Sequence, residues 1–316
     1  MVGKGFSRVF HYAQFILFFC ISPFLRFFGR VVFWGEKGGR KDPIFIVGAP
    51  RTGSTIFYQA LTNYYNVLYF DNVVSRWYRT ILFGFWLSSR KYGMQPHHSF
   101  SSEHGVTKGG HSPSECGEFW YRWLPKDRHF VEKADPVMAA SIAKEINQVS
   151  ARFGLPLVFK NLNAGQRLRL IIKAFPDARI VFIRRDPRFV LRSILKARQK
   201  VGVTEGQWWS VRPPHFDRYL GLSEIQMCAA QVFYVERQII EDLKLFPSAN
   251  VHVVNYNDLS SGLLMAIGAE LSLTKRPGGS LPIFTQDSEE SVPAHEMDAL
   301  SQAIACYPFS ELHYEK

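Results

Sequence analysis

The feature that most constrains this chain is a regular alternation of short apolar runs with longer helical patterns. The runs are bounded by Pro, Gly or polar residues, which is typical of buried parallel strands. Expected strands cover residues 44–47, 67–70, 157–159, 179–183 and 251–254, and expected helices cover 54–63, 166–175, 188–200, 223–246 and 263–271. This order predicts an α/β fold with a central parallel sheet flanked by helices.

Residues 71–156 interrupt the alternation and are rich in aromatic residues, His, Ser and Gly. We expect them to form a helical and loop insertion over one edge of the sheet. The 316 residues are 47% hydrophobic and 21% charged, which excludes a disordered chain. We therefore divide the chain into a hydrophobic N-terminal segment, residues 1–40, and a main domain, residues 41–316.

Residues 6–34 are hydrophobic with basic flanks. Their charge-free run, residues 12–25, would form a helix of roughly 21 Å, short of the ~30 Å of a bilayer core. We predict an interfacial helix on the membrane surface, and a spanning anchor or a helix packed on its own domain remains open. Because the next motif begins at Ile44, no room is left for a long lumenal stem. We expect a cytoplasmic protein at the inner face of the membrane.

The composition leaves several classes of partner open. A net charge of +11 suits a polyanionic ligand, an acidic glycan, nucleic acid or an anionic membrane. The four cysteines are widely spaced, so neither a zinc site nor a disulfide framework is indicated, and reduced thiols are expected. His97, His98 and His104 do not form a convincing metal-ligand cluster. We expect no metal and no nucleic-acid partner.

The most informative motif joins the first expected strand to the first expected helix. Gly48 and Gly53 have the spacing of a phosphate-binding loop, whose backbone amides face an anion. An ATP or GTP enzyme would carry Lys at position 54, but this chain has Ser54, and the cation lies inside the loop at Arg51. Arg51 could bind the terminal group of a 5′ phosphate chain, and an ordinary helix start is the alternative. The expected ligands are Arg51, Thr52, Gly53, Ser54 and Thr55.

A second cationic motif follows the expected strand 179–183. A magnesium site needs an Asp at the strand end that is free to bind the metal. Here Arg184 and Arg185 precede Asp186, and they would repel a divalent metal and attract a phosphate. Asp186 is better explained as a helix N-cap with Pro187 at the first helical position. Arg185 and Ser193 would then face a second phosphate, and a solvated basic strand end is the alternative. Two phosphate sites without magnesium ligands indicate a nucleotide phosphorylated at both its 5′ and 3′ ends.

These motifs resemble those of sulfotransferases that use 3′-phosphoadenosine-5′-phosphosulfate (PAPS). Residues 50–55 look like the 5′-phosphosulfate loop, and residues 182–193 look like the 3′-phosphate motif. Residues 175–179 and 254–259 also fit the family, so the resemblance covers roughly residues 44–271. The Arg at position 51, where many cytosolic members carry Lys, resembles the bacterial and Golgi carbohydrate branches of the family. The resemblance implies a P-loop-like three-layer fold, a PAPS co-substrate and no metal requirement.

The chain departs from cytosolic members where these carry a catalytic His, because Lys160 is followed by Asn161, Leu162 and Asn163. The general base must therefore come from elsewhere. Glu115 and Glu118 resemble an acidic motif of bacterial members, and on a helix they would share a face, where burial could raise the pKa of one. A helix N-terminal turn stabilised by acids is the alternative, and His111 is a second candidate base.

Two other features are weaker candidates. Trp208, Trp209 and Tyr219 could stack on the acceptor or on adenine, or belong to an aromatic core or lid. Residues 275–279 could cover the 3′-phosphate, although a plain basic turn fits as well.

The sequence therefore predicts transfer of a sulfuryl group from PAPS to a hydroxyl of a carbohydrate, lipid or small-molecule acceptor, with release of adenosine 3′,5′-bisphosphate. The acceptor and the base stay open, and we expect the insertion 71–156 to lie on the acceptor side of the site. The alternative enzyme is a P-loop nucleotide-dependent kinase or NTPase, and a basic membrane- or nucleic-acid-binding module is the non-enzymatic alternative.

Overall fold

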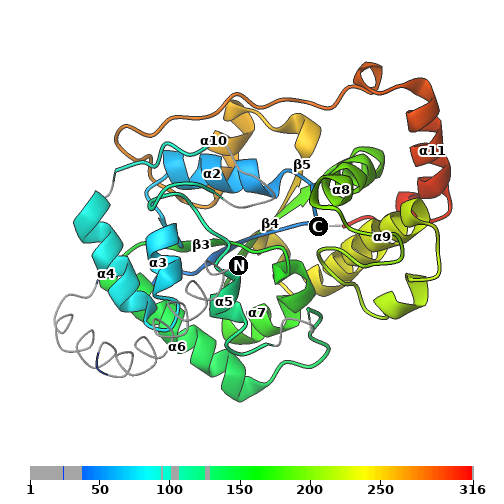
Figure 1. Cartoon of the computed structure of the whole chain (residues 1–316). Helices are drawn as coiled ribbons and strands as arrows, with labels where there is room; N and C mark the ends of the chain where they lie inside the picture. The colour runs from blue at the N-terminus through cyan, green and yellow to red at the C-terminus, as the bar shows by residue number, and fades with distance from the viewer. Residues whose placement is uncertain (1–23, 25–37, 94, 101–106, 125–128, 315–316) are drawn as a thin grey trace, which may run out of the picture.

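A five-stranded parallel sheet forms the centre of the protein (Figure 1), with strands in the order β2-β3-β1-β4-β5. The computed structural model describes Phe24 and residues 38–93, 95–100, 107–124 and 129–314. The predicted α/β fold is confirmed, and each of the five expected strands is present within one or two residues. The strands are β1 (Ile44–Val47), β2 (Leu68–Tyr69), β3 (Leu157–Lys160), β4 (Arg179–Arg184) and β5 (Val251–Asn255).

Helices cover both faces of this sheet because side chains alternate along each strand. Ile44 and Ile46 pack in one apolar cluster with α2 and α10, whereas Phe45 and Val47 pack in another with α6, α7, α8 and α9. The helices are α2 (Ser54–Tyr64), α3 (Asn72–Arg76), α4 (Ile81–Tyr92), α5 (Gly117–Trp120), α6 (Pro136–Phe153), α7 (Leu168–Ala174), α8 (Pro187–Val201), α9 (Glu224–Leu243), α10 (Ser261–Glu270) and α11 (Ala294–Ala305).

The strand order creates a crevice at the carboxyl end of β1. In register, Val47 of β1 lies beside Phe182 of β4, and Ile46 lies beside Lys160 of β3. The chain leaves β1 towards β2 on one side and later returns to β4 on the other. In open parallel sheets such a reversal leaves a crevice outside the strand ends, where ligands bind. The segments that follow β1, β3 and β4 therefore meet at one edge.

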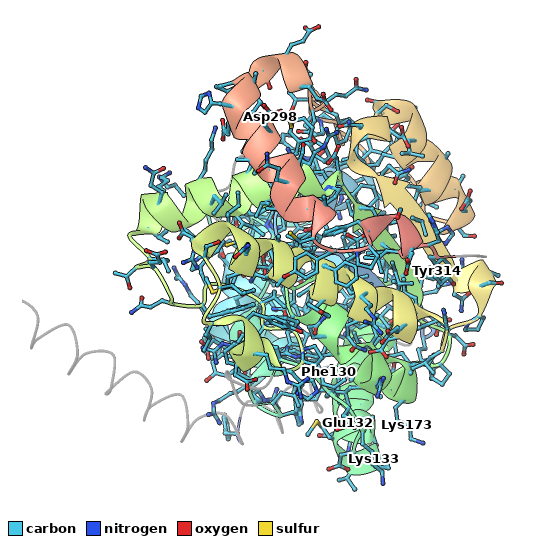
Figure 2. All side chains as sticks on the ribbon, turned by 90° about the vertical axis from the view of Figure 1, so that its right-hand side faces the viewer. Phe130, Glu132, Lys133, Lys173, Asp298 and Tyr314 are labelled. Carbon is cyan, nitrogen blue, oxygen red and sulfur yellow. The ribbon has the colours of Figure 1, made fainter. Side chains whose placement is uncertain are left out.

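Two parts of the chain differ from the sequence-based expectation. The helix expected over 166–175 begins as a 3-10 turn, Ala164–Arg167, before α7. Helix α11 was not expected, and it packs against α8 and α9 near the C-terminus (Figure 2). Apart from Phe24, the hydrophobic segment 6–34 lies outside the described residues. Within the described part of the chain, no helix combines the length and apolarity needed to cross a membrane.

His97 is a buried histidine that the fold holds in its neutral form. Its Nδ1 accepts the Ser99 amide at 3.2 Å, and its Nε2 lies 3.0 Å from the Thr62 hydroxyl, which donates to the carbonyl of Tyr58. Protonation of Nδ1 would place two N–H groups face to face. Burial is the main reason that the pKa of His97 falls to about 3.

We expect the free energy of unfolding to fall as the pH drops from 6.5 towards 3, because the unfolded chain then binds a proton that folded His97 refuses. At pH 4 the loss from this residue is about 3 kcal/mol. Urea unfolding at pH 7 and pH 4 measures it. His97→Gln should flatten the pH dependence, whereas His98→Gln, at the exposed neighbour, should not. Equal slopes in both variants would contradict this assignment.

Candidate active site

The loop between β1 and α2 is shaped by two close backbone approaches. A Cβ at Gly48 would lie 2.6 Å from the carbonyl oxygen of Ile183, and a Cβ at Gly53 would lie 2.3 Å from the ring of Tyr256. Gly53 has φ 87° and provides no side-chain cap for α2. The amides of the first turn of α2 therefore face the crevice without a side-chain partner from the N-cap, which favours an anion there.

Arg51 and Arg185 lie together at the ends of neighbouring strands. Nε of Arg51 donates to the hydroxyl of Ser193 at 2.9 Å, and Nη1 of Arg185 donates to the carbonyl oxygen of Arg51 at 2.8 Å. Burial and the nearby charge of Arg185 lower the pKa of Arg51. Two guanidinium groups held this close repel each other, so an anion between them would relieve the repulsion.

Two adjoining cavities contain both arginines. A cavity of about 410 Å³ lies between α8 and residues 286–291 and includes Ser193 in its wall. A second cavity of about 250 Å³ lies over the loop and includes Gly53, Ser54 and Thr55. The structure thus brings together the residues that the two motifs contribute, with Thr52 as the exception. The Thr52 side chain is buried and donates to the carbonyl of Ala49 at 3.0 Å, so it stabilises the loop instead of lining the cavity.

A third cavity, of about 500 Å³, adjoins the loop cavity, and both are lined by Glu115, Leu162 and Ser210. Glu118 also lines the third cavity. The expectation that the two acids share one helix face is wrong. Helix α5 begins only at Gly117, and Cys116 before it has a left-handed backbone with φ 43°, so Glu115 lies outside the helix.

Lys160 is a site residue that sequence reasoning missed. It is the last residue of β3, its side chain is 3% exposed, and its ammonium group forms an ion pair with Glu115. The other oxygen of Glu115 accepts the backbone amide of Leu162 at 3.0 Å. The available signal was a charge at the end of an otherwise apolar strand, because a buried Lys requires a partner.

The remaining parts of the second motif have structural roles. Arg184 forms an ion pair with the buried Glu236 of α9 at 2.5 Å, and burial raises the pKa of this Glu while Arg184 opposes the rise. Asp186 accepts the amide of Arg188 at 2.9 Å as the N-cap of α8, with Pro187 at the first helical position, as predicted. No group of three or more potential metal ligands occurs among the described residues.

Two other sequence candidates lie away from these cavities. His111 contacts Asp71 at 3.1 Å and the carbonyl of Gln95 at 2.9 Å, and it is not in the walls of the three cavities described above. Arg276 is buried and donates to the carbonyls of Tyr65 and Val67, which shows a structural clamp at the start of β2. His111 is therefore a poor candidate base, and no residue of the segment 275–279 lines any of these three cavities.

Of the three aromatic candidates, one lines a cavity and two pack against other aromatic residues. Trp209 lines the loop cavity. Trp208 instead packs against Phe216, and Tyr219 stacks on Tyr234. Only Trp209 of these three is available to a ligand in the cavities described here.

The comparison with protein families decides the family. A model of the sulfotransferase family matches residues 43–263, which include the loop, both arginines and the acidic pair. The chain belongs to the sulfotransferase family. The family is a transferase family, so this protein is an enzyme. No curated protein matches the sequence.

Solved structures of sulfotransferases are also similar in outline. A Mycobacterium tuberculosis sulfotransferase has a TM-score of 0.43 and 14% identity, over 85% of this chain and 78% of that one. A Mycobacterium avium sulfotransferase has a TM-score of 0.45 and 13% identity, over 85% and 69%. The sulfotransferase domain of a Synechococcus olefin synthase has a TM-score of 0.41 and 15% identity, over 86% and 98%.

We expect Gly53→Ala to destabilise this sulfotransferase more than a glycine replacement that changes only the backbone preference. Gly206 is the matched control, because its φ is 76° and a Cβ there would meet no atom within 4 Å. The control should lose about 1 kcal/mol of unfolding free energy, and Gly53→Ala should lose at least ~1 kcal/mol more through the collision with Tyr256. Urea unfolding measures both. Equal losses would mean that the loop can move away from Tyr256.

Proposed function

We propose that this sulfotransferase takes its sulfuryl group from PAPS and transfers it to a hydroxyl, releasing adenosine 3′,5′-bisphosphate. One observation carries the proposal: Arg51 and Arg185 line the same two adjoining cavities. One cavity lies over the loop between β1 and α2, and the other lies beside Ser193 on α8. A nucleotide with phosphates at both ends can therefore bridge them, with its adenosine between.

Each end of the donor has its own set of groups. Arg51 and the amides at Ser54 and Thr55 would bind the 5′-phosphosulfate, because the first turn of α2 favours an anion. Arg185 and Ser193 would bind the 3′-phosphate. Lys160 lines the loop cavity, and its ammonium group would stabilise the negative charge that develops on the leaving phosphate oxygen.

The reaction needs positioning and charge neutralisation more than covalent help. The acceptor oxygen bonds to sulfur, the bond between sulfur and the 5′-phosphate oxygen breaks with its electron pair, and the acceptor proton passes to a base. In this proposal Arg51, Arg185 and Lys160 supply the positive charge, and turnover in excess chelator tests whether these side chains suffice. A kinase or NTPase would need ligands for magnesium and a Lys at position 54, where this chain has Ser54.

Glu115 is the better candidate base because of where it lies. It belongs to the walls of both the loop cavity and the third cavity, so it borders the point where an acceptor hydroxyl would meet the sulfuryl group. Lys160 and the Leu162 amide each bind one of its oxygens, and each carboxylate oxygen has a second lone pair for the proton. Glu118 lines the third cavity but not the loop cavity, so it is better suited to contact the acceptor.

The third cavity is the proposed acceptor site. Its wall includes hydroxyl and amide side chains that suit a hydroxylated carbohydrate, glycolipid or small molecule: Asn72, Ser75, Thr107, Tyr121, Asn161 and Asn163. We further propose that the hydrophobic segment 6–34 holds the enzyme at the inner face of the membrane, close to a lipid-linked acceptor, which co-sedimentation with anionic vesicles would measure.

Arg51→Ala and Arg185→Ala should each lower kcat/KM for PAPS by at least ~100-fold, because each removes charge-assisted bonds to one end of the donor. Transfer of radiolabel from PAPS to extract fractions measures this, with circular dichroism as the test of folding. Arg237→Ala is the control, since Arg237 is exposed and pairs with Glu241 within α9. Undiminished transfer by either folded variant would refute the donor assignment.

Glu115→Gln should lower kcat by roughly 10²- to 10⁴-fold with donor binding retained, because the amide cannot take the acceptor proton. Glu118→Gln should change kcat by less than about tenfold and act mainly on the KM of the acceptor. Single-turnover assays with saturating PAPS separate the two effects. A larger kcat loss in the Glu118 variant would reverse the two roles.

A further inference from the structure

The segment that leads to α11, together with the first turn of α11, carries acids that pair with Arg185 and with two arginines of α8. We name residues 284–296 the C-terminal strap; in Figure 1 it belongs to the orange-to-red chain that joins α10 to α11 above α8. Ion pairs join Arg185 to Asp287, Arg188 to Glu289, and Arg192 to Glu296. The strap therefore forms the wall of the Ser193 cavity opposite α8.

The pair between Arg185 and Asp287 differs from the other two because it lies inside the cavity. Nε of Arg185 donates to one oxygen of Asp287 at 2.7 Å and Nη2 donates to the other at 2.5 Å, a bidentate pair. The two side chains are 17% and 8% exposed. The backbone N–H of Asp287 donates to the side chain of Asn257 at 3.0 Å, which fixes the strap at this point.

A carboxylate and a phosphate bind the same edge of a guanidinium group. Asp287 holds the Nε and Nη2 edge of Arg185, and the carbonyl oxygen of Arg51 holds Nη1. We propose that Asp287 is an internal competitor for the 3′-phosphate, which must displace this carboxylate to bind Arg185 in a bidentate way. The inference rests on the proposed PAPS site and adds a control on its affinity.

The positive charge of the cavity wall explains why a competing carboxylate would help turnover. Its described wall contains five cationic side chains, Arg51, Arg185, Arg192, Lys196 and Lys200, and Asp287 is the one carboxylate among these wall residues. So many cations would bind adenosine 3′,5′-bisphosphate tightly and slow its release. As the product leaves, Asp287 returns to Arg185, so the guanidinium group keeps a partner throughout. The strap thus favours turnover over tight retention of the nucleotide.

Isothermal titration with adenosine 3′,5′-bisphosphate and with adenosine 5′-phosphate tests the proposal on the full chain. Asp287→Asn and Asp287→Ala should each bind the bisphosphate about tenfold more tightly than the wild type, which is on the order of one charge-assisted hydrogen bond. Neither variant should bind adenosine 5′-phosphate more tightly, because that nucleotide has no 3′-phosphate. The second variant guards against a new bond made by the Asn amide.

Glu289→Gln is the matched control, because Glu289 lies on the same strap and pairs with Arg188 of α8. The side chain of Glu289 is 59% exposed. It should leave the affinity for both nucleotides within twofold of the wild type. Unchanged or weaker bisphosphate binding by the Asp287 variants would overturn the inference and make Asp287 a positioning residue for Arg185. A wild type that binds neither nucleotide would refute the proposed donor site itself, and the competition with it.

Discussion

The hydrogen bond from Arg185 to the carbonyl oxygen of Arg51 joins the segments that follow two neighbouring strands, and the arrangement of the site depends on it. Arg51 has φ 70°, a left-handed conformation that costs free energy in a residue with a Cβ. The bond helps to hold Arg51 in this conformation and brings two like charges together. The strand order makes the bond possible, because β1 and β4 are adjacent and parallel.

Buried ion pairs then orient the other charged groups around this contact. The pairs between Lys160 and Glu115 and between Arg184 and Glu236 contain side chains that are at most 5% exposed on one partner. Because removing such charges from water costs about as much as their attraction returns, these pairs add little net stability. Their effect is to fix direction: one points Lys160 towards the loop cavity, and the other turns Arg184 away from the crevice and leaves Arg185 to face it.

The sequence was sufficient for the fold and for part of the site. Short, mostly apolar runs such as 44–47 and 179–183 are typical of strands buried on both faces, and their alternation with longer helical patterns predicted the parallel sheet. Arg51 and Arg185 were found because each lies in the short segment that follows such a strand. The side-by-side placement of the two strands, which makes these residues neighbours, depends on the order of the sheet, which periodicity does not encode.

What the sequence could not supply depends on long-range contacts or on single backbone angles. Asp287 lies 102 positions from Arg185 along the chain, and Glu115 lies 45 positions from Lys160, so no local pattern announces either pair. The acids Glu115 and Glu118 were assigned to one helix face by their spacing. The left-handed conformation of Cys116 separates them, and a sequence pattern does not encode this angle.

The proposed function depends on one nucleotide that is held at both ends by guanidinium groups from neighbouring strands. A crystal structure of the enzyme with adenosine 3′,5′-bisphosphate tests it most directly. We expect the 5′-phosphate at the amides of Ser54 and Thr55 beside Arg51, and the 3′-phosphate between Arg185 and Ser193. A nucleotide with both phosphates outside these two cavities, or one that contacts only one of the two arginines, would contradict it.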